Sequence, residues 1–70
     1  MTIGQSVRAA RLSKLLSQIE LAKLAKTTQV TVSRIEANSE AKLSTIIRIA
    51  DALDMSIDKL IGREVKHGEA

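Results

Sequence analysis

The sequence contains no cysteine, no proline and no phenylalanine, tyrosine or tryptophan. Without cysteine, neither a disulfide nor a cysteine-ligated zinc site can stabilise the chain. Without aromatic side chains, it lacks the stacking platforms that proteins use to bind single-stranded nucleic acid or to build an RNA-recognition sheet. The single histidine, His67, has no partner ligand near it in the sequence, so no metal site is expected. Any hydrophobic core must therefore be aliphatic.

The short length of the chain limits it to one domain, because it has only 70 residues. A chain of this size buries only about 60% of its unfolded surface, which leaves oligomerisation as the remaining way to supplement its stability. No run of about 18 apolar residues is present to span a bilayer, so no membrane partner is expected. Arg8, Arg11 and Lys14 occupy the place where a signal peptide would be apolar. We therefore expect a cytoplasmic protein.

The residues that catalysis needs are also missing. There is no second histidine, no carboxylate pair in an apolar setting and no glycine-rich phosphate loop. The sequence thus predicts a protein that is not an enzyme and that requires no cofactor.

Charge is distributed unevenly along the chain. Residues 1–48 carry eight Lys and Arg against three Asp and Glu, a balance of +5, whereas residues 49–70 carry three against five, a balance of −2. A basic N-terminal part suggests that one end of the molecule faces a polyanion such as DNA. Ordinary scatter of charge on a solvated surface would look the same, so charge alone does not decide between the two.

An all-α fold is predicted, because no proline is present and glycine occurs only at Gly4, Gly62 and Gly68. Ser17 and Glu20 form the pattern of a capping box, and Thr28 and Ser56 are further candidate N-caps. The predicted helices span about Ile3–Leu16, Ser17–Lys26, Gln29–Ala37, Leu43–Leu53 and Ile57–Ile61, with Gly62 closing the last.

Apolar residues at helical spacing predict which faces point inward. They are Ile3, Val7, Ala10 and Leu15 in the first helix, Leu21, Ala22 and Ala25 in the second, Val32 and Ile35 in the third, and Ile46, Ile49, Ala50 and Leu53 in the fourth. Residues 63–70 are charged and lack an apolar face, so we expect a domain over residues 1–62 followed by a disordered tail.

The stretch from Gln18 to Glu36 is the most informative part of the sequence. Two short helices joined by three or four residues must lie close together, and the second has few apolar residues with which to pack. Its start is polar at Thr28, Gln29 and Ser33. Glutamine can pair with adenine N6 and N7, and threonine or valine can contact a thymine methyl group. This pattern is typical of a helix laid in a DNA major groove, although each polar residue alone could be an ordinary solvated side chain.

Several short motifs follow one another with family-like spacing. They are Leu16-Ser17-Gln18, Glu20-Leu21-Ala22, Thr27-Thr28-Gln29, Val32-Ser33-Arg34-Ile35-Glu36 and Ile49-Ala50-Asp51-Ala52-Leu53-Asp54-Met55-Ser56, with Leu60 at matching spacing. In this order the chain resembles the Cro and lambdoid-repressor family (XRE family) over about Ile3–Ile61. The resemblance implies a five-helix, lambda-repressor-like DNA-binding domain whose second and third helices form a helix-turn-helix.

The resemblance also implies roles for individual residues. Gln18 contacts a phosphate and supports Gln29, while Arg11 and Glu36 form a structural ion pair between the first and third helices. The family's DNA-facing positions are Thr28, Gln29, Val30, Ser33 and Arg34 in this chain, and Asn38 and Lys42 fall in the loop that meets the DNA backbone.

The chain departs from the family pattern in the turn between the two helices. Lys26 stands where the family usually has glycine, so it is either strained by roughly 1–2 kcal/mol in a left-handed conformation or part of a remodelled turn, and it is a candidate phosphate contact. Ala25 replaces a larger apolar residue. Ile19 and Leu24 occupy positions that are usually polar, where they are either repacked core or a protein-binding patch.

These observations predict a transcriptional regulator, a repressor, that binds a palindromic double-stranded DNA site as a homodimer. Ile57, Leu60 and Ile61 are candidates for the dimer interface or for the core. The alternative is an antitoxin-type module that binds a toxin partner through Ile19 and Leu24 and regulates its own operon. A helical scaffold without DNA affinity is a third and weaker hypothesis.

Overall fold

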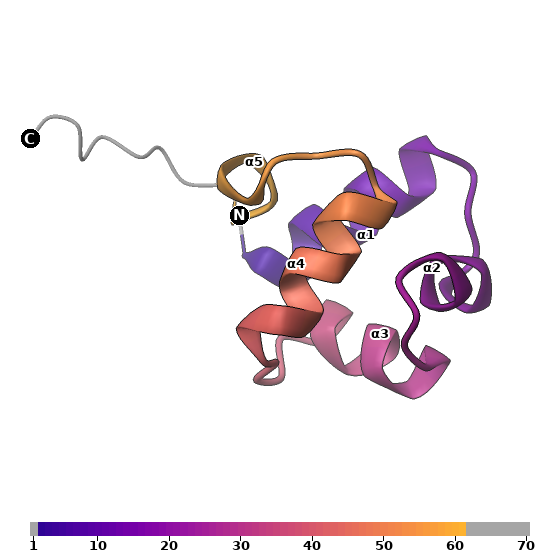
Figure 1. The fold of residues 1–70 in the computed structure, drawn as a ribbon, viewed down its shortest axis with the longest axis horizontal. Helices are drawn as coiled ribbons and strands as arrows, with labels where there is room; N and C mark the ends of the chain where they lie inside the picture. The colour runs from indigo at the N-terminus through magenta and orange to yellow at the C-terminus, as the bar shows by residue number, and fades with distance from the viewer. Residues whose placement is uncertain (1, 62–70) are drawn as a thin grey trace, which may run out of the picture.

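The computed structural model describes residues 2–61, which form five α-helices. They are α1 (Ile3–Ser13), α2 (Gln18–Leu24), α3 (Gln29–Glu36), α4 (Leu43–Ala52) and α5 (Ile57–Ile61), as Figure 1 shows. The all-α, five-helix prediction is confirmed. Within the described residues, no helix is both long and apolar enough to cross a membrane. The expected tail, residues 63–70, and the closing residue Gly62 lie outside the described part of the chain.

Side-chain caps begin most of the helices. Ser17 and Glu20 form the predicted capping box of α2, with N–H···O distances of 2.9 and 2.8 Å. The Thr28 hydroxyl caps α3 by accepting the Thr31 N–H at 3.2 Å, and Ser56 accepts the Lys59 N–H at 3.2 Å. A second capping box, which the sequence reading missed, joins Thr2 and Gln5 at the start of α1. These bonds satisfy backbone donors that a helix leaves unpaired at its first turn.

Four helices end in the same backbone motif, although no glycine is present at any of these ends. The residue after each C-cap is left-handed, with φ between 58° and 68°, at Leu15, Lys26, Asn38 and Asp54. In each case the following N–H bonds back to a carbonyl five residues earlier, for example Thr27 to Ala22 at 2.9 Å. This is the Schellman arrangement that usually recruits glycine. Lys26 is therefore left-handed, and the turn keeps the conformation expected for glycine.

The early end of α1 corrects the predicted inner face of this helix. Leu15 was expected to point inward, but it is 90% exposed because α1 stops at Ser13 and the left-handed residue turns its side chain out of the helical register. Leu16 packs against the core instead. Ile3 is also more exposed than predicted, at 36%, because it lies at the edge where α1 begins.

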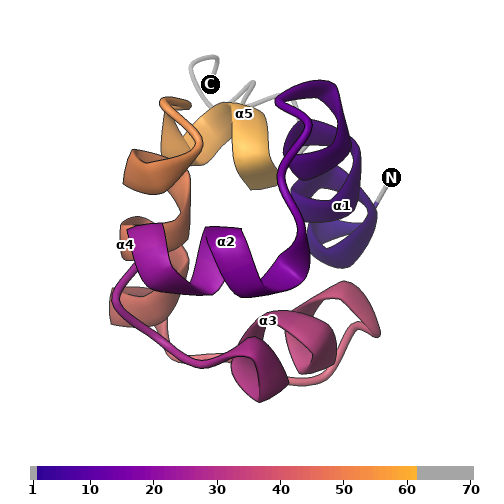
Figure 2. The ribbon, with the colours of Figure 1, turned by 90° about the vertical axis from the view of Figure 1, so that its right-hand side faces the viewer.

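The core is aliphatic and draws on all five helices. Its buried members are Val7, Leu21, Ala22, Ala25, Val32, Ile35, Ile46, Ile49, Ala50, Leu53 and Leu60. Helix α3 packs on α1 and α2, while α5 packs on α1 and α4. Figure 2 shows the result: α2 runs across the middle of the view, with α3 at one end of the molecule and α5 at the other.

Gly4 allows the start of α1 to approach the end of α3 closely. A Cβ atom at this position would lie 2.5 Å from the Ile35 carbonyl oxygen and 2.8 Å from that of Glu36. Real Cβ atoms do not tolerate such contacts with a fixed backbone. The glycine therefore helps to place the C-terminal turn of α3, where Glu36 and Asn38 lie.

Candidate nucleic-acid interface

Helix α3 has one buried face and one exposed face. Val32 and Ile35 are at most 2% exposed and anchor the helix against α1 and α2. The opposite face carries Gln29, Val30, Ser33 and Arg34, all of which are exposed. Because α3 forms one end of the molecule in Figure 2, this face is open to a large partner such as a duplex.

A chain of hydrogen bonds connects the interior with the start of this face. Arg11 donates to Glu36 through Nε at 2.7 Å and through Nη2 at 3.1 Å. Gln18 Nε2 donates to the same carboxylate at 3.1 Å, and Gln29 Nε2 donates to Gln18 Oε1 at 2.9 Å. The ion-pair side chains are only 9% and 5% exposed, whereas Gln29 is exposed. The network therefore runs from a buried ion pair to the surface of α3.

The surroundings of the ion pair favour the charged form of both partners. Burial by itself would raise the pKa of Glu36, but hydrogen bonds from Arg11 and Gln18 and the charges of Arg11 and Arg8 together lower it below 4.5. The hydrogen bond to Glu36, aided by its charge, raises the pKa of Arg11 in spite of desolvation. The third nitrogen of Arg11, Nη1, donates to the Leu16 carbonyl at 2.9 Å, so the guanidinium also holds the chain that enters α2.

A groove beside the exposed face of α3 is lined by two further cations. Arg34 and Lys42 line this groove of about 300 Å³ between α3 and the loop that leads to α4, together with Thr27, Thr31 and Glu40. Lys42 and Asn38 are exposed at the two ends of this loop, and Lys26 is exposed in the turn before α3. The structure thus gathers the candidate phosphate contacts around the ends of α3.

Thr28 caps α3, which limits its part in DNA recognition. Its hydroxyl accepts the Thr31 N–H and donates to Thr31 Oγ1 at 3.0 Å. Thr28 is exposed as a residue, but its hydroxyl is engaged in capping, so an apolar contact is the interaction that it can still offer.

The sequence reading missed one residue that supports the site. Arg48 of α4 donates from Nε to the Ala25 carbonyl at 3.1 Å, which satisfies a backbone acceptor at the end of α2. No spacing rule could identify this contact, because the two residues are 23 positions apart and meet only through the fold.

The candidate dimer residues lie at the other end of the molecule. Leu60 is fully buried in the protomer core, and Ile57 is partly buried against it. Leu60 therefore offers no accessible surface to a partner in this structure. The side chain of Ile61 lies outside the described part of the structure.

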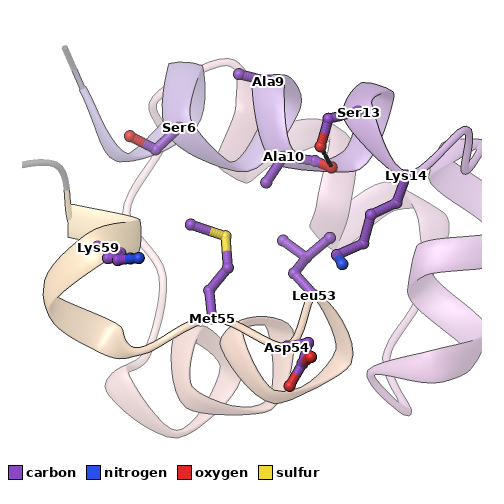
Figure 3. Close-up of a pocket in the computed structure, with 9 residues that line it drawn as sticks. All are labelled: Ser6, Ala9, Ala10, Ser13, Lys14, Leu53, Asp54, Met55 and Lys59. Carbon is purple, nitrogen blue, oxygen red and sulfur yellow. Dashed lines mark hydrogen bonds between the residues drawn. The ribbon is translucent and has the colours of Figure 1, made fainter.

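A second groove, of about 430 Å³, opens between α1 and the turn from α4 to α5. Figure 3 shows Met55 pointing from this turn towards α1, with Lys14, Asp54 and Lys59 among the other lining residues. The α3 residues named above take no part in it, so it is separate from the candidate interface.

Comparisons with known proteins agree with this geometry. Residues 7–60 match a family model described as helix-turn-helix. The immunity repressor protein of Bacillus phage phi105 is 32% identical over 65 residues, which cover 91% of this chain and 45% of that protein. The chain thus spans less than half the length of this curated relative.

A solved structure shows a similar fold. The P22 c2 repressor protein, crystallised in complex with a synthetic operator, superposes with a TM-score of 0.82 at 25% identity. The match covers 91% of this chain and 98% of the P22 chain. The five-helix, lambda-repressor-like fold predicted from the sequence is confirmed by this match. The chain belongs to the helix-turn-helix family of DNA-binding proteins (XRE family) and is similar to phage repressors.

Proposed function

We propose that this chain is a sequence-specific transcriptional repressor that binds a palindromic double-stranded DNA operator as a homodimer. The observation that carries the proposal is the exposed face of α3, which begins with Gln29 held by Gln18 at 2.9 Å. An ordered amide at the start of an exposed helix can read a base edge without first losing conformational freedom. DNA binding would take place in the cytoplasm and would require no cofactor.

In this proposal α3 lies in the major groove. Gln29 pairs with adenine through N6 and N7, and Val30, which is 58% exposed, contacts a thymine methyl group. Ser33 and Thr28 extend the same surface. Gln18, Lys26, Arg34, Asn38 and Lys42 contact the phosphates on either side and set the register without reading sequence.

Two copies would pair through α5, with Ile57 and Ile61 as the contacts and Leu60 supporting them from the core. Helix α5 lies at the opposite end of the molecule from α3 (Figure 2), so pairing there leaves both recognition helices free. Half-sites about one helical turn apart would then bind the two copies, as in other helix-turn-helix dimers.

The first experiment measures binding to the DNA upstream of the gene for this chain and to a random duplex, at about 50 and about 200 mM salt. Phosphate contacts weaken strongly between these two concentrations. The fluorescent label must be on the DNA, because the protein has no Tyr or Trp. Tight, site-selective binding with two protomers per site supports the proposal. Equal and weak binding to both duplexes that disappears at the higher salt would refute it.

A second candidate function rests on the exposure of Ile19 and Leu24, which are 55% and 56% exposed on α2. Neither is repacked into the core, so both are available for a protein partner such as a toxin, as an antitoxin would require. A toxin-like reading frame beside this gene, whose product co-purifies with the wild-type chain but not with an Ile19→Ser and Leu24→Ser double variant, would establish it. Absence of co-purification with any adjoining product would count against it.

A further inference from the structure

We infer that Glu36 is a positioning residue for base recognition: through Gln18 it orients the amide of Gln29 so that adenine is favoured over guanine. The inference rests on the proposed reading of a base by Gln29. It assigns to the ion pair, expected only to stabilise the fold, a role in sequence specificity.

The first step is the chemistry of Glu36. An ionised carboxylate only accepts hydrogen bonds, whereas a side-chain amide has a donor end and an acceptor end. Arg11 fixes this carboxylate from one side with bonds of 2.7 and 3.1 Å, and the lowered pKa of Glu36 keeps it ionised at neutral pH. Gln18 must therefore present its Nε2 end, which lies 3.1 Å from Glu36 Oε1.

The second step carries this polarity outward. Because Nε2 of Gln18 faces the carboxylate, its Oε1 faces Gln29. Gln29 must therefore donate to this acceptor, and its Nε2 lies 2.9 Å from Gln18 Oε1. Reversing either amide would place two acceptors or two donors against each other, and next to Glu36 it would place an amide oxygen against a charged carboxylate.

The third step is what remains for DNA. Gln29 keeps Oε1 and its second N–H free, one acceptor and one donor. Adenine offers the N6 donor and the N7 acceptor, which match this pair, whereas guanine offers two acceptors, O6 and N7. An amide of the opposite polarity would present two N–H groups and fit guanine. A buried carboxylate that does not face the DNA thus sets the hydrogen-bonding pattern at the surface.

The decisive variant is Glu36→Gln. Arg11 Nε would hold the new side chain by an oxygen in the place of Oε2, which puts the new amide nitrogen in the place of Oε1. This nitrogen removes the bond from Arg11 Nη2, faces Gln18 and reverses the polarity of both outer amides. Val7→Ala is the matched control, because Val7 is fully buried but makes none of these hydrogen bonds, so this variant loses core packing without touching the network. Both variants are assayed well below their melting temperatures, with folding checked by circular dichroism.

The measurement is the ratio of affinities for operators that differ only at the base pair read by Gln29. That base pair is found first, as the position where Gln29→Ala loses discrimination. The wild type and Val7→Ala should prefer adenine over guanine by at least about fivefold, as one bidentate contact allows. Glu36→Gln should lose that preference or reverse it.

The outcomes separate the two levels of the argument. If Gln29→Ala changes discrimination at no position, base reading itself fails. If it does change but Glu36→Gln keeps the wild-type ratio, or Val7→Ala loses the ratio as fully, the positioning role of Glu36 is overturned. Should Glu36→Gln not fold, the wild type is tested on an operator with purine, which lacks the N6 amine, in place of that adenine. An unchanged affinity would then overturn the inference.

Discussion

Single residues decide whether this surface reads sequence or only binds DNA. Gln29 is exposed but held by Gln18, while its neighbours Val30 and Ser33 lie free on the same face of α3. Removing a residue that contacts only phosphates would weaken binding to every duplex alike. Removing a residue that reads a base would change the order of preference among sequences.

We expect Gln29→Ala to relax specificity at one base pair, at a loss of about 1–3 kcal/mol in binding to the operator. The physical reason is the loss of a paired donor and acceptor in the major groove. Titration of a set of single-base operator variants measures it. Equal losses on operator and random DNA would show that Gln29 does not read a base.

The ion pair makes a pH-dependent contribution to stability. The pKa of Glu36 is lower in the folded state than its ordinary value of 4.5. The ionised form therefore stabilises the fold fully above the ordinary value, and this stabilisation is lost as the pH falls through the lower, folded-state pKa. We expect the stability advantage of the wild type over Glu36→Gln to shrink between about pH 5 and pH 2, where carboxylates lose their charge. Urea unfolding followed by circular dichroism measures both proteins, and a constant difference across this range would contradict the prediction.

The helices of this fold are short; most begin with a side-chain cap, and four end in a strained left-handed residue. Capping boxes start α1 and α2, but Leu15, Lys26, Asn38 and Asp54 adopt left-handed conformations without glycine. Such conformations disfavour ordinary residues by roughly 1–2 kcal/mol each, and asparagine and aspartate by less. Glycine at such a turn would therefore relieve strain and stabilise the fold.

We expect Leu15→Gly to raise the free energy of unfolding by about 0.5–1 kcal/mol, since relief of strain exceeds the extra entropy of glycine in the unfolded chain. Leu15 is 90% exposed, so little packing is lost. Ala37→Gly is the matched control, because Ala37 has φ −89° and should lose stability instead. Stabilisation by both substitutions, or by neither, would contradict the role of the backbone angle.

The contact between α1 and α3 should respond strongly to one methyl group. Gly4→Ala would place a Cβ atom 2.5 Å from the Ile35 carbonyl oxygen, so the two helices must separate. We expect a loss of about 1–3 kcal/mol in stability, typical of overpacking. Thermal unfolding measures it, and an unchanged melting temperature would mean that the helices move apart freely.

The whole molecule has its candidate recognition helix, α3, and its candidate dimer helix, α5, at opposite ends (Figure 2). This arrangement predicts that association and DNA contact can be perturbed separately. The small size of the core also predicts that a dimer would be stabilised by mass action, with a melting temperature that rises with protein concentration. Thermal unfolding at several protein concentrations tests this, and operator complexes that hold one protomer at every concentration would refute the dimer.

Charge belongs to the same scale, because in the proposed complex the basic residues would act together on the phosphate backbone. We expect Lys42→Ala to weaken binding about equally on all sequences and to reduce the slope of log affinity against log salt by about 1. Ile47→Ala on α4, an exposed residue that does not line the groove beside α3, serves as the control. An unchanged slope for Lys42→Ala would remove Lys42 from the interface.

The sequence by itself determined the helices, their order and the family, because helical spacing, the Ser17 and Thr28 caps and the helix-turn-helix motif are local patterns. It also predicted the core positions of α2, α3 and α4, since apolar residues three and four apart must share a face. It failed at the end of α1. A Schellman turn without glycine carries no sequence signal, so Leu15 was placed in the core.

The family resemblance implied the Arg11–Glu36 pair and the support of Gln29 by Gln18, but only the tertiary structure joins these contacts into one network, through the bond from Gln18 to Glu36. Arg11 and Glu36 are 25 positions apart, and the order of bonds from Glu36 through Gln18 to Gln29 depends on how α1, α2 and α3 pack. The same holds for Arg48 at the end of α2 and for Gly4 beneath α3. Hydrogen bonds are directional and act over about 3 Å, so the polarity of the Gln29 amide is a property of the packed helices, which no local pattern contains.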